Sequence, residues 1–354
     1  MADTTTTTRP IDAAGPVAIP GVQFRHFDRQ RDYEAVAALL TAANRHDGVD
    51  WVPTAELLRH EWEHNDGFDP DEDAIVAELG GRLIGLVDTD WRQRGELVFH
   101  HINPVVDPPH RHRGVGRVLL AWAEAHAIAG ARSGQKGSMS LPHLLAGWAD
   151  LEIPDVAPFA AAAGYEVNGY GVMMTRDLTE PIEEVPLPDG LEVRPVRPED
   201  HRTIWDADCE AFKDHRDPAV RTDADFERWF TMPEIDTGLW EVAWDGDEVA
   251  GSVWNHVFAE DNVRLGIKRG WLEHVSVRRR WRKRGLAAAL MTRSMRRLRD
   301  LGLTEAALGA DAENLSGAIR LYESLGFRRV RTAAGYRKAV PMPPTDADEA
   351  SPEG

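Results

Sequence analysis

Apolar residues follow two kinds of spacing along most of the chain, and these spacings predict strands and helices in regular succession. Short apolar runs at 74–79 and 82–87, separated by a turn, predict two paired strands. Apolar residues three and four positions apart in 33–40 predict an amphipathic helix. Because strands and helices alternate, we predict an α/β fold.

The same succession of elements occurs twice. An opening strand, an amphipathic helix and two paired strands are predicted at 22–27, 33–40, 74–79 and 82–87, and again at 191–196, 204–212, 239–244 and 248–253. We therefore predict a tandem duplication with a repeat of roughly 150 residues, a typical domain size. The expected parts are a disordered tail at 1–20, an N-terminal domain at 21–178, a Pro- and acid-rich linker at 179–190, a C-terminal domain at 191–340 and a disordered tail at 341–354.

A turn with the pattern Arg-x-x-Gly-x-Ala joins a strand to a helix in the second repeat. Val275 and Val277 alternate in the strand, Arg282 begins the pattern, and the helix starts near Gly285. The first N–H groups of a helix and the positive end of its dipole attract an anion. Small residues at Gly285 and Ala287 leave room for a pyrophosphate to approach the backbone. This junction is therefore predicted to bind phosphate.

A second motif follows in the same repeat, N-x-x-x-A-x-x-L-Y-x-x-x-G-F at 314–327. Together, the two motifs resemble those of the GNAT superfamily of acyl-CoA N-acyltransferases. The first repeat carries a matching turn at 111–116 and a Gly-Tyr pair at 164–165. The resemblance implies two tandem GNAT-like domains, each with a mixed, largely antiparallel sheet flanked by helices. It also implies acetyl-CoA as co-substrate, no metal, and direct attack by a primary amine of a small molecule or peptide.

The resemblance also assigns residues to the coenzyme. In the second repeat the expected coenzyme-binding residues are Val275, Val277, Arg282, Arg284, Gly285, Leu286, Ala287 and Asn314. Asn314 opens a helix, so it is equally an ordinary N-cap. In the first repeat a possible second coenzyme site comprises Arg111, Arg113, Gly114 and Gly116.

Transfer to an amine also needs groups that move protons. Glu273 lies where the family often has its base, and Tyr322 matches the family's general acid. Strand alternation predicts that Glu273, Val275 and Val277 share one face, opposite Leu272, His274 and Ser276. His274 would be the base only if a β-bulge reversed these faces.

The first repeat lacks both proton-transfer groups. When the repeats are aligned on their motifs, Ile102 takes the place of Glu273 and Ala160 that of Tyr322. Neither isoleucine nor alanine can exchange a proton. We therefore expect the N-terminal domain not to catalyse transfer, with His100 as the one candidate replacement base.

Composition narrows the class of protein further. The formal net charge of −18 argues against general nucleic-acid binding and suits a cationic amine. The basic run at 278–284 adjoins the predicted phosphate turn, which favours a role at phosphates over one at nucleic acid. A single cysteine, Cys209, excludes an intrachain disulfide, and the apolar runs are too short to span a membrane. These features predict a cytoplasmic protein.

Two other classes of function stay open at this point. Residues 60–64, His-Glu-Trp-Glu-His, match the H-E-x-x-H pattern of zinc proteases, although no third ligand is identifiable. A non-catalytic acyl-CoA sensor would keep the phosphate turn, but it has no need for Glu273 and Tyr322.

Overall fold

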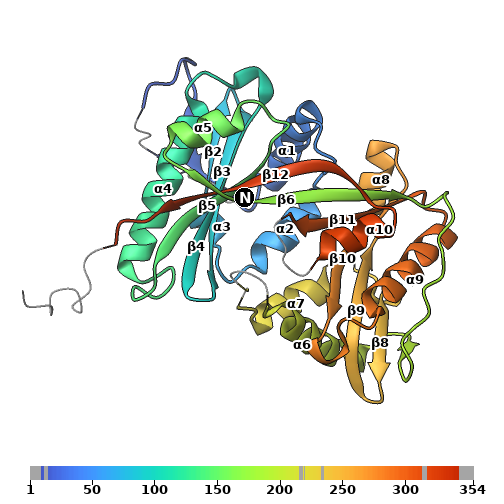
Figure 1. Cartoon of the computed structure of the whole chain (residues 1–354). Helices are drawn as coiled ribbons and strands as arrows, with labels where there is room; N and C mark the ends of the chain where they lie inside the picture. The colour runs from blue at the N-terminus through green and yellow to red at the C-terminus, as the bar shows by residue number, and fades with distance from the viewer. Residues whose placement is uncertain are drawn as a thin grey trace, which may run out of the picture. The chain divides into compact units, whose positions relative to one another are not determined.

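A computed structural model of the chain describes residues 9–11, 15–214, 218, 220–232, 235–312 and 317–342 (Figure 1). These residues form two compact units. The first contains the described residues up to Trp148, then 159–166, and again those from Tyr336 onward; the second contains 149–158 and 167–335. The units are therefore discontinuous in sequence. Helix α5 (Val156–Ala162) and strand β12 (Arg328–Ala339) each carry residues of both units.

The first unit is a mixed sheet with helices on both faces. Its strands lie in the order β1 (Gln23–His26), β2 (Ala74–Leu79), β3 (Arg82–Arg94), β4 (Leu97–Val106) and β5 (His143–Asp150). β4 and β5 are parallel, and the other neighbours are antiparallel. The helical segments are α1 (Tyr33–Asp47), α2 (Ala55–Glu63), α3 (Pro70–Asp73), the short 3-10 turn η1 (Pro108–His110) and α4 (Val115–Ser133).

Side-chain alternation in β3 separates the two helical layers of this unit. Leu86 packs in a core cluster with residues of α1 and α2. The neighbouring Gly85 has Val115 and Leu119 of α4 beside it, so close that a Cβ would lie 3.0 Å from each. Because successive residues of a strand face opposite sides, α1 and α2 cover one face and α4 the other.

The second unit repeats this architecture. Its strands lie in the order β6 (Glu166–Asp177), β11 (Glu305–Asp311), β10 (Arg269–Val277), β9 (Glu248–His256), β8 (Glu241–Asp245) and β7 (Glu192–Arg194). β10 and β11 are parallel, and the other neighbours are antiparallel. The helical segments are η2 (Pro198–Asp200), α6 (His201–Phe212), α7 (Asp223–Thr231), η3 (Thr237–Leu239), α8 (Ala259–Leu265), η4 (Arg279–Trp281), α9 (Leu286–Asp300) and α10 (Ala318–Ser324).

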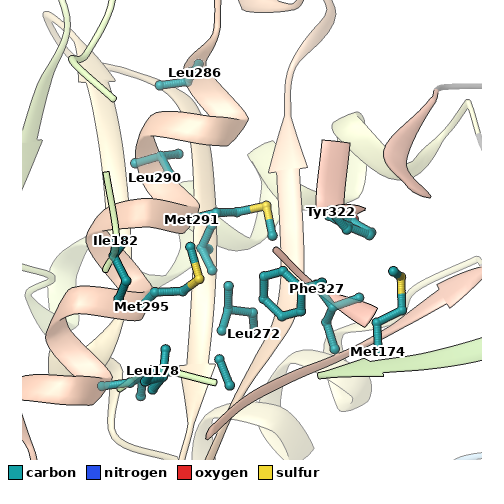
Figure 2. Close-up of a cluster of buried hydrophobic side chains, with 14 of the residues drawn as sticks. Met174, Leu178, Ile182, Leu272, Leu286, Leu290, Met291, Met295, Tyr322 and Phe327 are labelled. Carbon is teal, nitrogen blue, oxygen red and sulfur yellow. The ribbon is translucent and has the colours of Figure 1, made fainter. Parts of the chain in front are cut away.

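Two buried clusters hold the second unit together, one on each face of its sheet. Figure 2 shows the first, which includes Leu286 and Leu290 of α9 and in which Leu272 of β10 lies beside Phe327. The second cluster joins Trp254 of β9 to residues of α6. The predicted fold class is confirmed: two α/β units, each a mixed sheet between helices. No described helix is both long and apolar enough to cross a membrane.

Candidate active site

The parallel strands β10 and β11 separate part of the way along their length. Arg269, Gly270 and Trp271 pair with residues 305–307 of β11. Beyond Trp271, the described part of β10 pairs only with β9, while β11 continues its ladder with β6 as far as Asp311. The sheet therefore opens between residues 272–277 and 308–311. A ligand can reach the backbone of β10 there without breaking a ladder.

The turn between β10 and α9 has an open helix N-terminus. Gly285 is the N-cap of α9, with a left-handed φ of 84°, and no side chain caps the helix. Among the described residues, chain neighbours apart, no atom lies within 4 Å of the place where a Cβ at Gly285 would stand, so none of them covers this position. Uncapped N–H groups at an open helix end form an anion site. The geometry fits the pyrophosphate of a coenzyme A.

The two predicted phosphate-binding arginines differ in their surroundings. The Arg282 guanidinium donates to the carbonyl oxygens of Val277 at 2.8 Å and Ala211 at 2.9 Å. It also pairs with Asp214 at 2.5 Å. Arg284 is exposed and donates to the Asp189 carbonyl at 3.2 Å. Arg282 thus holds the turn in place, and Arg284 is the better placed of the two to meet a ligand.

The other predicted coenzyme residues lie around the same turn. Leu286 is buried in the core, so only its backbone can face a ligand. Val275 and Val277 pack against the same core, and Ala287 is half-buried. Asn314 lies outside the described residues.

The matching turn of the first unit is covered by the chain itself. Gly114 caps α4 with a φ of 94°. A Cβ on Gly114 would lie 2.4 Å from the Pro16 carbonyl oxygen, and Ala18 N–H donates to the Arg113 carbonyl at 2.9 Å. The segment formed by residues 15–18 therefore occupies the place above this turn that is open above Gly285.

The arginine of the first turn shares two kinds of contact with its counterpart, one to a strand carbonyl and one to an aspartate. Arg111 donates to the Val106 carbonyl at 3.1 Å and makes a two-pronged pair with Asp47, with both distances at 2.7 Å. Arg113 is exposed, and Gly116 is half-buried with Val106 3.5 Å from its would-be Cβ. Both repeats thus keep the arginine as an anchor, and only the second keeps the turn open.

A β-bulge changes the facing of residues in β10. The register with β9 shifts between Leu272, which pairs with Asn255, and His274, which pairs with Trp254. Leu272 consequently packs in the same cluster as Val275 and Val277. The prediction that these residues lie on opposite faces is wrong, because it assumed unbroken alternation.

The bulge leaves Glu273 and His274 in different surroundings. The Glu273 side chain is exposed, yet the protein around it desolvates the carboxyl enough to raise its pKa, and His274 partly offsets this effect. His274 points toward α6, where its Nδ1 lies 2.8 Å from Asp208 Oδ2. Asp208 is not among the residues predicted from the sequence. Its signal was a carboxylate among the apolar positions of an amphipathic helix.

Tyr322 belongs to the core of the second unit. Its side chain is 8% exposed, and its ring centre is 6.3 Å from that of Phe327 (Figure 2). Burial raises the pKa of the phenol to about 12. The hydroxyl therefore keeps its proton at neutral pH, as a general acid requires.

The corresponding positions of the first unit have no titratable group. Ile102 and Ala160 are both buried. The ladder between β3 and β4 runs without a register shift from Arg94–Leu97 to Gly85–Val106, so β4 has no bulge where β10 has one. His100 is fully buried and hydrogen-bonded to His143, and burial lowers its pKa to about 3.

The H-E-x-x-H segment lies on α2. The rings of His60 and His64 stack with their centres 4.5 Å apart, and His64 forms the C-cap. Within the described ranges, no group of three or more His, Cys, Asp or Glu side chains is arranged to hold a metal ion.

Comparison with known proteins gives the family. The profile of the Acetyltransferase (GNAT) family matches residues 34–134 and 201–327, and the chain belongs to that family. A mycothiol acetyltransferase of Thermobispora bispora is 31% identical over 314 residues, which cover 87% of this chain and 96% of that protein. A mycothiol acetyltransferase of Geodermatophilus obscurus is 29% identical over 309 residues, which cover 86% of this chain and 94% of that protein. The chain is an acyl-CoA-dependent acetyltransferase.

Solved structures agree with the tandem architecture. A GCN5-related N-acetyltransferase from Sphaerobacter thermophilus matches with a TM-score of 0.69 and 25% identity, covering 93% of this chain and 98% of that one. A tandem GNAT protein from the clavulanic acid biosynthesis pathway matches with a TM-score of 0.63. Its identity is 16%, and the match covers 92% of this chain and all of the other, so it supports the fold alone.

Proposed function

We propose that the second unit transfers an acetyl group from acetyl-CoA directly to a primary amine. The observation that carries this proposal is the open N-terminus of α9 at Gly285, directly beyond the opening between β10 and β11. The backbone of Gly285, Leu286 and Ala287 would hold the pyrophosphate, with Arg284 as the side chain beside it. The length of the strand agrees with this placement. At a rise of roughly 3.3 Å per residue, Glu273 lies about 13 Å from Val277 along β10. A pantetheine arm laid along β10 would bring the thioester to the bulge.

The proposed chemistry needs no covalent intermediate. The amine nitrogen attacks the thioester carbonyl carbon, the new C–N bond forms, and the C–S bond breaks. The amine proton passes to a base at the bulge, where Glu273 is the residue that the family resemblance selects and His274 is its neighbour. Tyr322 is proposed to protonate the departing thiolate, since its hydroxyl carries a proton at neutral pH, although burial, which raises its pKa to about 12, makes it a weaker acid than a free tyrosine.

The acceptor is an amine on a small molecule or peptide, and the reaction is proposed to take place in the cytoplasm. The net charge of −18 would attract a cationic amine. The specific alternative is mycothiol synthase, whose acceptor is the cysteinyl amine of a glucosaminyl-inositol. The relatives described as mycothiol acetyltransferases support it.

The first unit is proposed to be a non-catalytic partner. Ile102 and Ala160 supply no proton-transfer group, and residues 15–18 cover its turn. We propose 21–178 and 191–340 as the boundaries of the two repeats, with coenzyme binding confined to the second.

The test is a transfer assay on the full chain. Acetyl-CoA is mixed with glucosamine, spermidine, a lysine peptide or cysteinyl glucosaminyl-inositol, and the acetylated product is identified by mass. Mass detection is needed because an acceptor with its own thiol would mask the release of coenzyme A. We expect one of these amines to gain a single acetyl group. Binding of acetyl-CoA without transfer to any of them would contradict the proposed amine chemistry.

A further inference from the structure

The strongest unexplained feature of the second unit is a buried acidic group that holds a histidine next to the proposed reaction centre. Asp208 lies on α6 with its carboxylate fully buried, and His274 lies on β10 with 16% of its side chain exposed. Asp208 Oδ2 is 2.8 Å from His274 Nδ1 and 2.7 Å from an Arg221 nitrogen. Among the residues that the structure describes, none is a hydrogen-bond partner of Asp208 Oδ1. A fully buried carboxylate is costly, so its place on this helix calls for a physical reason.

The Asp208 contact fixes which nitrogen of His274 carries a proton. Although burial opposes ionisation, His274 and Arg221 lower the pKa of Asp208, so it is a carboxylate at neutral pH. A carboxylate only accepts hydrogen bonds, and His274 Nδ1 must therefore be the donor. In the neutral ring, Nε2 then has the lone pair and is able to accept a proton.

Aromatic rings fix the plane of the same imidazole. The His274 ring stacks on Trp254 with the centres 4.5 Å apart and the planes 8° apart. Trp254 in turn stacks on Trp240 at 4.2 Å, and Trp229 lies 4.9 Å from His274 on another side. Phe212 of α6 is a third aromatic neighbour, with its ring centre 5.5 Å from that of His274, so the described structure holds the imidazole by the hydrogen bond to Asp208 and by three aromatic rings. Such a base loses little orientational freedom when it reacts.

The bulge at Glu273 is what turns His274 toward Asp208. Without the register shift between Leu272 and His274, both would face the same side of the sheet. Leu272 is in the core with α9, whereas His274 contacts α6 and α7. Glu273, by contrast, is exposed, and among the described residues it makes no hydrogen bond that would orient it.

The first unit lacks this pair at the matching positions, although its His101 on β4 lies 2.7 Å from Asp90 of β3. Aligned on Val106 and Val277, Asn103 stands where the second unit has His274. Aligned on the acidic partners of Arg111 and Arg282, Thr41 stands where the second unit has Asp208. A pair between the helix and the bulged strand therefore occurs in the unit whose phosphate turn is open, and not at the matching positions of the other.

We infer that His274, and not Glu273, is the general base of acetyl transfer. Asp208 is the residue that positions His274. Nε2 of His274 takes the proton of the attacking amine as the C–N bond forms, and the C–S bond breaks with the thiolate taking the proton of Tyr322. Asp208 stabilises the resulting imidazolium, and Arg221 keeps the carboxylate from holding that charge too tightly. This inference rests on the proposed function.

Among the described residues, His256 and Glu273 are the other acid-base groups whose pKa values His274 affects, and neither replaces it. His256 of β9 is buried, and burial together with the charge of His274 lowers its pKa to about 4, so it stays neutral. Glu273 neighbours His274 along β10, and its raised pKa makes it the competing base. The experiment must therefore separate His274 from Glu273.

The test compares three variants of the full chain, His274→Gln, Asp208→Asn and Glu273→Gln, with Asp206→Asn as the matched control. Asp206 is on the same helix, but it is exposed and pairs with Arg202. The rate constant kcat/KM is measured against pH with glucosamine and with spermidine. Two amines of different basicity are used because the pH profile of kcat/KM reflects ionisation of both the amine and the enzyme. The part of the profile that reflects the amine shifts when the amine is changed, and the part that reflects the enzyme does not.

We expect His274→Gln to lower kcat/KM by about 100-fold or more and to remove the enzyme's acid limb, with the acetyl-CoA Kd unchanged. Asp208→Asn should move that limb to lower pH by about one unit, because an uncharged amide no longer stabilises the imidazolium. Imidazole added to a folded His274→Ala variant should restore part of the rate. Glu273→Gln and Asp206→Asn should keep the limb where it is.

The contrary results are distinct. If Glu273→Gln removes the limb while Asp208→Asn leaves it unmoved, the base is Glu273 and this inference is wrong. If the wild type binds acetyl-CoA but acetylates no amine, the proposed function fails and the role of His274 fails with it. Circular dichroism and melting curves identify a variant that has lost its fold. If one of the three variants has done so, the rescue of a folded His274→Ala variant by imidazole decides whether His274 is the base.

Discussion

Arg282 and Asp214 form an ion pair with 2.5 Å between nitrogen and oxygen, which ties the turn after β10 to the end of α6. The same guanidinium donates to the Val277 carbonyl, while Arg284, two residues on, is exposed. Arg282→Gln should therefore lower the melting temperature and disturb the turn. Arg284→Gln should keep the melting temperature and weaken acetyl-CoA binding, more so at low salt. Thermal melts and titration calorimetry at two salt concentrations check this pair, and equal stability losses would contradict it.

Gly285 should tolerate a small residue better than a charged one. Gly285→Glu would set a carboxylate against the pyrophosphate and weaken acetyl-CoA binding by more than about 100-fold. Its positive φ of 84° strains any side chain, so Gly285→Asn, which accepts this conformation, is the control. Calorimetric Kd values decide between charge and strain. Unchanged affinity in folded Gly285→Glu would remove the phosphate site from α9.

Tyr322→Phe removes a hydroxyl and keeps the ring in the core. Since the hydroxyl is proposed to protonate the thiolate, we expect kcat to fall about 10-fold or more while the acetyl-CoA Kd stays the same. Stopped-time assays with product mass give kcat, and calorimetry gives Kd. A parental kcat would assign the tyrosine to the core alone.

Asp208→Asn should reduce stability most at neutral pH. The folded-state pKa of Asp208 is lowered, so its ionisation contributes stability above the unfolded value of about 3.9, and that contribution is lost as the pH falls through the folded value. Removing one partner of a buried ion pair costs about 3–5 kcal/mol. Urea unfolding at pH 7 and pH 3 should therefore give a larger difference between wild type and variant at pH 7. A difference that does not depend on pH would indicate lost packing instead.

Each chain should bind one acetyl-CoA. Residues 15–18 cover the turn at Gly114 and leave no room there for a phosphate. Replacing Gly114 and Gly285 in turn by alanine tests whether the space at Gly114 is filled. Both positions have a positive φ, so both alanines incur the same backbone strain, but only Gly114→Ala also meets the Pro16 carbonyl. Gly114→Ala should therefore lower the melting temperature more than Gly285→Ala. Two acetyl-CoA molecules per chain in a calorimetric titration would contradict the covered turn.

Local patterns were enough to predict the tandem fold. The spacing of apolar residues and the two glycine turns are short-range features, and both recur at matching places in the two repeats. They predict the two paired strands before each turn, because elements that follow one another in the sequence usually pack on each other. The discontinuity of the compact units was not predictable in the same way, since it depends on where the end of β12 packs, far away in sequence.

The bulge in β10 marks where local reasoning fails. A regular strand of Leu272, Glu273 and His274 predicts alternate faces, and nothing in those three residues specifies an extra one. The shift depends on pairing with Asn255 and Trp254 in another strand. The role of Arg282 was likewise hidden, because Asp214 and the Ala211 carbonyl reach it from α6 and beyond. The facing of His274 and the role of Arg282 both depend on contacts between segments that are distant in sequence, and not on the residue types alone.

The covered turn of the first unit changes how the two copies of one motif tolerate mutation. Gly114 leaves room for a backbone carbonyl of the same chain, whereas Gly285 leaves room for something from outside. Selection on the first glycine would thus act through the amount of folded protein, and selection on the second through turnover. A shortened or tagged amino terminus would disturb the first copy alone. Gly114 and Gly285, which occupy the same place in the duplicated motif, are therefore constrained for different reasons.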